Sequence, residues 1–177
     1  VDVSGHGIAP AMFSVSVHNL LRSGTLDDDT LRDPGRVLTE LNRLFRMDQQ
    51  ADNFFTIWYG VYQPATRTLR YAGAGHPPAI ILTADGSDPV LLPSQSIPIG
   101  VLRDVAFEAD SYHLSPDTDL LIYSDGAYEI ALPDGRRWTL EAFIDLWARN
   151  ARAPHWTLER LVAQLRNLSA TGDFGDD

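Results

Sequence analysis

The chain has 177 residues, with 14 Arg, no Lys and 24 acidic residues, so its formal net charge at pH 7 is −10. This balance excludes nucleic-acid binding through bulk charge, while a hydrophobic content of 44% is enough to bury a core and argues against disorder. Cysteine is absent, which excludes a disulfide framework, a thiolate metal site and a cysteine nucleophile. Most of the acids are Asp, a residue typical of turns, helix caps and cation ligands.

No apolar run approaches the roughly 20 residues that a membrane-spanning helix needs, and no basic segment precedes an apolar one as in a signal peptide. We therefore expect a cytoplasmic protein with no membrane insertion and no nucleic-acid partner. The first residue is Val1 rather than Met, so we expect the chain to be part of a longer translated product. Repeats, linkers and low-complexity tracts are absent, which predicts one domain over residues 1–177.

Apolar residues recur with helical spacing in four segments, two near each end of the chain. Asp33 followed by Pro34 predicts the start of the second helix, because Asp caps free N–H groups and Pro suits the first helical position. We expect these stripes to be core faces. Their members are Phe13, Val17, Leu20 and Leu21; Val37, Leu41, Leu44 and Phe45; Leu140, Phe143, Ile144 and Trp147; and Leu158, Leu161, Val162, Leu165 and Leu168.

The region between the two helical pairs is rich in β-branched and aromatic residues and is interrupted by turn residues. Turns are expected at 63–66 and 84–87. An order of helices, then antiparallel strands, then helices predicts an α+β fold rather than a doubly wound parallel sheet. The predicted strands are 54–62, 68–72, 79–83, 90–92, 107–114 and 119–124.

Three Asp-containing motifs carry the candidate chemistry. Residues 2–7 read Asp-Val-Ser-Gly-His-Gly, residues 119–126 form an apolar strand that ends in Asp-Gly, and residues 173–177 read Asp-Phe-Gly-Asp-Asp. Carboxylates brought together without a basic partner repel one another, and a hard divalent cation is the usual remedy. Asp125-Gly126 alone would be an ordinary turn, as we expect for Asp85-Gly86 and Asp134-Gly135, but the strand before it and the first motif favour a cation site.

Two histidines lie in Gly-rich segments. His6 is inside the first motif, and His76 precedes two prolines. Each is a candidate either for a contact with phosphate or for a structural hydrogen bond. Other hydrolytic chemistries lack their residues, since there is no His pair with zinc spacing, no Gly-x-Ser-x-Gly elbow and no Lys for a Walker loop.

Four segments together resemble the SpoIIE-type bacterial phosphatases, which belong to the metal-dependent PPM (PP2C-like) serine/threonine phosphatases. Besides Asp-Val-Ser-Gly-His-Gly, these are Phe-Phe-Thr at 54–56, Tyr-Ala-Gly-Ala-Gly-His-Pro-Pro-Ala at 71–79 and Leu-Ile-Tyr-Ser-Asp-Gly-Ala-Tyr-Glu at 121–129. The resemblance covers nearly the whole chain in the right order. It implies two packed antiparallel sheets flanked by helices, the αββα sandwich of the PPM phosphatases.

The resemblance also implies a site that holds two Mn²⁺ or Mg²⁺ ions. By motif position, Asp2 resembles the catalytic carboxylate that bridges both ions, and the Val3 carbonyl resembles the adjacent ligand. Asp125 resembles the catalytic strand-end ligand of one ion. Asp176 corresponds to the first Asp of the family's terminal Asp-Asp motif, with Asp173 and Asp177 as alternatives.

The implied reaction is the hydrolysis of phosphoserine or phosphothreonine by a water that bridges the two ions. The implied substrate is a phosphorylated regulatory protein of the anti-anti-sigma type. The chain would then be the output module of a bacterial signalling protein, and a homodimer is a further option in this family.

The chain departs from the family pattern at its ends and at Tyr128, where the family often has a smaller polar residue. The family's acidic motif before the first Gly-rich loop and its strands beyond both ends are absent, so we expect the fold to be incomplete at both termini. The isolated piece would bind metal weakly and expose unpaired sheet edges. Two alternatives to an active phosphatase are a catalytically weak relative that binds a regulator and a non-enzymatic α+β sensor domain.

Overall fold

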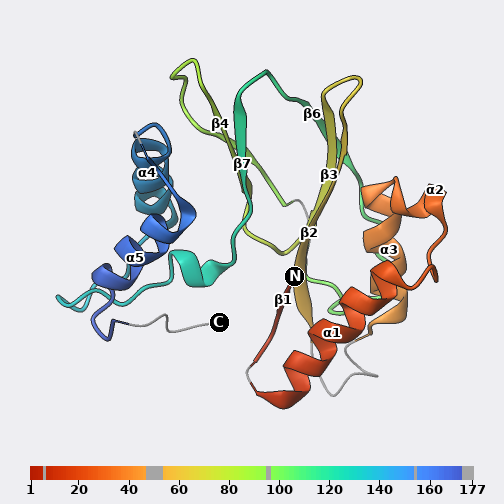
Figure 1. Cartoon of the computed structure of the whole chain (residues 1–177). Helices are drawn as coiled ribbons and strands as arrows, with labels where there is room; N and C mark the ends of the chain where they lie inside the picture. The colour runs from red at the N-terminus through yellow and green to blue at the C-terminus, as the bar shows by residue number, and fades with distance from the viewer. Residues whose placement is uncertain (6, 47–53, 95–96, 154, 173–177) are drawn as a thin grey trace. The chain divides into compact units, whose positions relative to one another are not determined.

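The computed structural model describes residues 1–5, 7–46, 54–94, 97–153 and 155–172. The chain divides into two compact units, in each of which strands combine with helices (Figure 1). Unit 1 comprises Val1–Ala79 and Leu92–Ser115, and unit 2 comprises Ile80–Leu91 and Pro116–Asp177. The predicted α+β class is confirmed. Within the described ranges, no helix is both long and apolar enough to cross a membrane.

Unit 1 contains a four-stranded antiparallel sheet in the order β1-β2-β3-β6. Its strands are β1 (Asp2–Val3), β2 (Phe55–Gln63), β3 (Thr68–Ala74) and β6 (Asp110–His113). Strands β2 and β3 form the predicted hairpin, with Gln63 opposite Thr68, so the turn lies one residue later than expected. Strand β1 pairs with β2 at one edge of the sheet, which places the first Asp-containing motif beside the Phe-Phe-Thr segment.

The helices of unit 1 are α1 (Ile8–Arg22), α2 (Asp28–Leu31) and α3 (Pro34–Leu44). Helix α3 begins as predicted, because the Asp33 carboxylate accepts hydrogen bonds from the N–H groups of Gly35 at 3.1 Å and Arg36 at 3.3 Å. Helix α2 was not predicted, since four residues are too few to show a helical period. Its N-cap, Asp27, accepts a hydrogen bond from the Thr30 N–H at 2.7 Å.

The core of unit 1 lies between the sheet and helices α1 and α3. The rings of Phe13, Phe45 and Phe55 meet edge to face, with centroids 5.2 to 5.8 Å apart. This contact joins α1, the end of α3 and the start of β2. The predicted stripes on both helices therefore supply the core, whose buried members include Phe13, Val17, Val37, Leu38, Leu41, Phe55, Ile57, Ala72 and Ala74.

A second sheet, in the order β5-β4-β7, lies mostly in unit 2. Its strands are β4 (Ala79–Thr83), β5 (Val90–Leu92) and β7 (Thr118–Leu121). Helices α4 (Leu140–Ala151) and α5 (Leu158–Leu168) begin after Thr139 and Thr157, which cap them. The buried core residues of unit 2 include Ile80, Leu82, Ile130, Phe143, Trp147, Leu161 and Leu165. Leu158 is an exception to its predicted stripe, because it is the first residue of α5 and is 52% exposed.

Two strands are shorter than predicted. The expected strand 107–114 is reduced to β6 because the Phe107 N–H donates to Thr39 Oγ1 at 3.0 Å instead of to a neighbouring strand. The expected strand 119–124 ends at Leu121, which pairs with Ile80 near the start of β4. Since the partner strand runs out there, the following residues leave the sheet.

Candidate active site

The first Asp-containing motif is fixed at the edge of the sheet in unit 1. Asp2 lies opposite Thr56 in the β1-β2 pair. Ser4 holds the chain beyond it, since its N–H donates to the Phe54 carbonyl at 2.9 Å and its Oγ accepts from the Phe54 N–H at 3.1 Å. Gly5 has φ of 85°, a conformation that glycine adopts without strain. The chain can therefore turn sharply from β1 into α1 and leave Asp2 and Val3 in strand conformation.

The second motif places Asp125 at the start of the short 3₁₀ helix η2 (Asp125–Ala127). The Asp125 carbonyl accepts hydrogen bonds from the N–H groups of Tyr128 at 2.9 Å and Glu129 at 2.8 Å, which fix the main chain. The carboxylate oxygen Oδ1 is buried and has no hydrogen-bond partner in the described part of the chain. Burial of such an oxygen is costly unless a compensating group binds it. A carboxylate oxygen is a hard donor, so this residue fits Mn²⁺ or Mg²⁺.

Tyr128 packs into an aromatic group beside Asp125. Its ring meets that of Tyr123 edge to face, with centroids 6.2 Å apart, and Tyr123 in turn lies 4.8 Å from the ring of Phe143 on α4. Burial raises the pKa of the Tyr123 hydroxyl, and the nearby Tyr128 raises it further. Tyr128, the departure from the family pattern, thus has a packing role in holding the Asp125 segment against unit 2's core.

His76 makes a buried hydrogen bond next to the first motif. Its side chain is only 5% exposed, and its Nδ1 lies 2.8 Å from Thr56 Oγ1. Thr56 is also the residue opposite Asp2 in the sheet. This contact supports the structural hypothesis for His76 over contact with phosphate. His6, the other candidate, lies outside the described residues.

The proposed ligands are distributed over both units. Asp2 and Val3 belong to unit 1, and Asp125 belongs to unit 2. Asp176 and its alternatives, Asp173 and Asp177, lie outside the described residues. Among the residues that the structure does describe, no three His, Asp or Glu side chains form a metal-binding cluster. Each unit thus contributes part of the predicted ligand set.

Thr56 is a site residue that we did not single out from the sequence. It belongs to the Phe-Phe-Thr segment, but no spacing rule relates it to His76 or Asp2. The available signals were its place in that segment and in a predicted strand, because pairing in a sheet brings distant residues opposite one another. Its role became visible through the register of β1 and β2.

The architecture matches solved phosphatase domains. The structure of the SiaA-PP2C domain of Pseudomonas aeruginosa aligns with a TM-score of 0.82 at 20% identity, over 99% of this chain and 69% of that one. The fold is therefore that of a PP2C-type domain. A family model described as Stage II sporulation protein E (SpoIIE) matches residues 1–177. The chain belongs to the SpoIIE family, as its motifs predicted.

Two relatives from Bacillus subtilis (strain 168) are similar over most of this chain. Phosphoserine phosphatase RsbP is 34% identical over 133 residues, which cover 73% of this chain and 32% of RsbP. Phosphoserine phosphatase RsbU is 26% identical over 134 residues, which cover 76% of this chain and 39% of RsbU. The matched region is thus a little over a third of the length of these relatives at most.

Proposed function

We propose that this chain is the catalytic part of a metal-dependent phosphatase that hydrolyses phosphoserine or phosphothreonine on a regulatory protein. Membership of the SpoIIE family and similarity to two proteins named phosphoserine phosphatases support the reaction class. The structural observation that carries the proposal is the buried Oδ1 of Asp125, which lacks a hydrogen-bond partner among the described residues. A divalent cation would compensate its charge and its missing contact.

Asp2, the Val3 carbonyl and Asp125 would hold two Mn²⁺ or Mg²⁺ ions, with Asp176 as the proposed C-terminal ligand. When bound, the ions supply a water of lowered pKa and offset the negative charge of the phosphate. This matters in a chain of net charge −10 whose first two Asp-containing motifs include no Arg or Lys. The side chains there supply ligands for cations rather than positive charge for phosphate.

The contribution of the protein itself is to orient these ligands. The pairing of β1 with β2 and the hydrogen bonds of Ser4 hold Asp2 in place. The hydrogen bonds to the Asp125 carbonyl and the packing of Tyr123 against Phe143 hold the second ligand. Fixed ligands lose little conformational freedom when they bind a cation or a substrate.

We extend the proposal to the biological setting through the family resemblance. The substrate would be a phosphorylated regulator of the anti-anti-sigma type, and the chain would act as one domain, the output module of a signalling protein. The match of the family model to all of residues 1–177 supports the single functional domain.

The test is the release of inorganic phosphate from a phosphoserine-containing protein, measured with Mn²⁺ and with a chelator. We expect activity that requires Mn²⁺ and that falls about a hundredfold in Asp125→Asn, equivalent to about 3 kcal/mol of transition-state stabilisation. Asp134→Asn is the matched control, because Asp134 lies in an exposed Asp-Gly turn of the same unit.

Activity that survives both the chelator and Asp125→Asn would rule out the two-cation mechanism. Tight binding of a regulator by the wild-type protein without any phosphate release would instead favour the regulator-binding alternative.

A further inference from the structure

Asp2 and Thr56 lie directly opposite each other in the antiparallel pair of β1 and β2. Residues in such positions project to the same face of a sheet, with Cβ atoms about 4.5–5.5 Å apart. Their neighbours Val3 and Phe55 pack into the core beneath the helices of unit 1, so the side chains of Asp2 and Thr56 lie on the opposite face. The Thr56 hydroxyl is therefore a close neighbour of the carboxylate that we propose as a ligand of both cations.

The Thr56 hydroxyl is in turn held by His76. The His76 side chain is 5% exposed, and its Nδ1 lies 2.8 Å from Thr56 Oγ1. A hydroxyl can accept one hydrogen bond while it donates another. If the imidazole carries a proton on Nδ1, it donates to Thr56 Oγ1 and leaves the hydroxyl proton for Asp2. In the other tautomer, the hydroxyl proton is used by His76 itself.

The main chain before His76 is fixed by close packing. A Cβ at Gly73 would lie 2.6 Å from Ser94 Oγ, and a Cβ at Gly75 would lie 2.7 Å from Pro98 Cγ. Ser94 and Pro98 therefore pack directly on the end of β3 and on the turn that follows it. This packing leaves the His76 main chain little freedom to move away from Thr56.

Ile99, the residue after Pro98, is bonded back to β2. Its N–H donates to the Phe55 carbonyl at 2.9 Å, and its carbonyl accepts from the Phe55 N–H at 3.3 Å. Phe55 is the residue before Thr56. The two partners of the contact between His76 and Thr56 thus belong to one continuous frame, all of it within unit 1.

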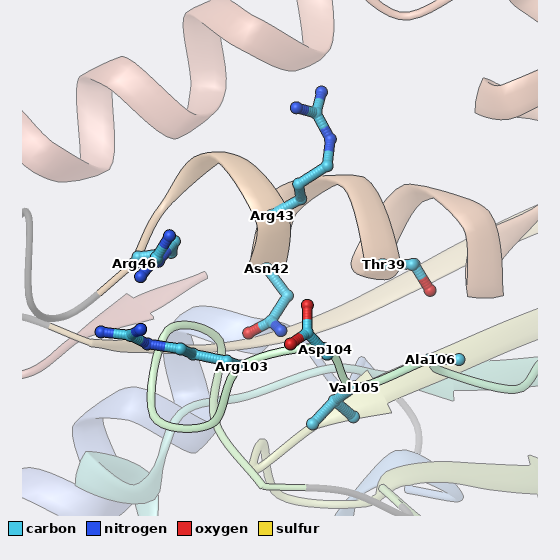
Figure 2. Close-up of a pocket in the computed structure, with 8 residues that line it drawn as sticks. All are labelled: Thr39, Asn42, Arg43, Arg46, Arg103, Asp104, Val105 and Ala106. Atoms are coloured by element: carbon cyan, nitrogen blue, oxygen red, sulfur yellow. The ribbon is translucent and has the colours of Figure 1, made fainter.

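Helix α3 extends this frame by fastening the loop that follows Ile99. Asn42 is 4% exposed, and its Nδ2 donates to the Leu102 carbonyl at 3.0 Å while its Oδ1 accepts from the Gly100 N–H at 2.9 Å. Figure 2 shows Asn42 pointing from α3 toward this loop. The loop forms one wall of a pocket of about 400 Å³, the arginine-lined pocket, whose lining includes Arg43, Arg46 and Arg103.

We infer that His76 and Thr56 are positioning residues for Asp2. His76 donates from Nδ1 to Thr56, and the Thr56 hydroxyl donates to the Asp2 carboxylate, which is thereby held in one orientation for the cations. The inference rests on the proposed function, because it concerns a proposed metal ligand. Hydrogen-bond partners of metal ligands commonly contribute about 10- to 100-fold to metal affinity.

The first experiment needs no metal. The tautomer of His76 is measured by ¹⁵N NMR of the full chain in the presence of a chelator, with His76→Ala identifying the signals. We expect a proton on Nδ1. A neutral ring protonated only on Nε2 overturns the inference, because the Thr56 hydroxyl proton would then be bound to His76 and could not reach Asp2.

The second experiment measures Mn²⁺ affinity directly, from the electron paramagnetic resonance signal of free Mn²⁺. Thr56→Val keeps the shape of the side chain but removes its hydroxyl, and it should weaken binding at least about tenfold. Thr56→Ser restores a hydroxyl and should bind within about threefold of wild type. Thr68→Val is the matched control, since it removes a hydroxyl at the other end of the β2-β3 hairpin, opposite Gln63.

His76→Ala should weaken Mn²⁺ binding in the wild-type background and have no further effect in Thr56→Val, because His76 acts through Thr56. Urea denaturation of each variant shows that it is folded. Unchanged Mn²⁺ affinity in folded Thr56→Val, or equal losses in Thr56→Val and Thr68→Val, overturns the inference and leaves the proposed function intact. Absence of Mn²⁺ binding by the wild type would instead remove the proposed function, and the inference with it.

Discussion

Individual residues of the segment 73–76 connect the strands of unit 1 to the neighbourhood of Asp2. His76 reaches Thr56 through its buried Nδ1, and Gly75 gives the chain the sharp change of direction that this contact needs, with φ of 66°. A Cβ at Gly75 would lie 2.7 Å from Pro98 Cγ, closer than a real Cβ atom approaches a non-bonded neighbour. Glycine is therefore required here for both its conformation and its size.

Gly75→Ala is expected to destabilise unit 1 by about 2–4 kcal/mol, the sum of left-handed strain and overpacking. Gly24→Ala isolates the first contribution, because Gly24 has φ of 74° and nothing would lie within 4 Å of its Cβ. We expect that control to cost only about 1 kcal/mol. Urea denaturation of the two variants and the wild type measures both values. Equal losses in the two variants would show that the Pro98 contact is unimportant.

At the scale of elements, helix α3 depends on an N-cap whose strength varies with pH. Burial of the Asp33 carboxylate works against its ionisation, but hydrogen bonds from the Arg36 N–H and from Arg70 outweigh it and lower the pKa of Asp33. The pKa in the unfolded chain is about 3.9, so it exceeds the folded value. The stabilisation of α3 by the ionised Asp33 carboxylate is thus fully present above the pKa that Asp33 has in the unfolded chain. It is lost as the pH falls through the lower pKa that Asp33 has in the folded protein.

We expect Asp33→Ala to lower the free energy of unfolding by about 1 kcal/mol at pH 7. The difference from wild type should shrink as the pH falls below about 3.9, because the wild-type carboxylate then becomes protonated. Asp33→Asn keeps a capping oxygen without a titrating group, and it should cost less at pH 7. Urea titrations over a pH series test this. A deficit of Asp33→Ala that stays constant down to acidic pH would contradict the assignment.

Elements governed by local rules were predicted well from the sequence. The bounds of β4 and β5 were exact, and the start of α3 followed from Asp33 and Pro34. Elements whose limits depend on a partner distant in the sequence were predicted less well. Strand β7 ends where its pairing with β4 runs out, and no residue in 119–124 signals that.

The proposed metal site and the arginine-lined pocket also differ in whether local sequence features could reveal them. Asp2 and Asp125 were chosen from motifs, which are local. The arginine-lined pocket could not be predicted, because the loop that carries Arg103 is fastened to α3 only through the long-range hydrogen bonds of Asn42. An amide side chain on a helix is usually exposed, and nothing in the sequence around Asn42 indicates that it is buried.

For the whole molecule, the separate cores predict separate responses to mutation. Leu41 in unit 1 is 0% exposed and Phe143 in unit 2 is 1% exposed. Truncation of either side chain to Ala lowers the free energy of unfolding by about 2–5 kcal/mol, because it leaves a cavity in the core. We expect hydrogen exchange to accelerate mainly in β2, β3 and α3 for Leu41→Ala, and mainly in β4, α4 and α5 for Phe143→Ala. Hydrogen-exchange mass spectrometry resolves these segments. Equal acceleration in all of them would mean that the two cores unfold as one.

The path of the chain sets an order of events during synthesis. After Ala79 the chain enters unit 2 for the segment Ile80–Leu91 and then returns to unit 1 until Ser115. A growing chain therefore releases β4 from the ribosome well before β7, α4 and α5 exist to cover it. The first unit can close as soon as β6 has emerged, while the apolar β4-β5 segment must wait for residues 116–177. Interrupted translation near residue 115 would leave this hairpin exposed to chaperones and proteases, and no single cleavage can yield both units intact.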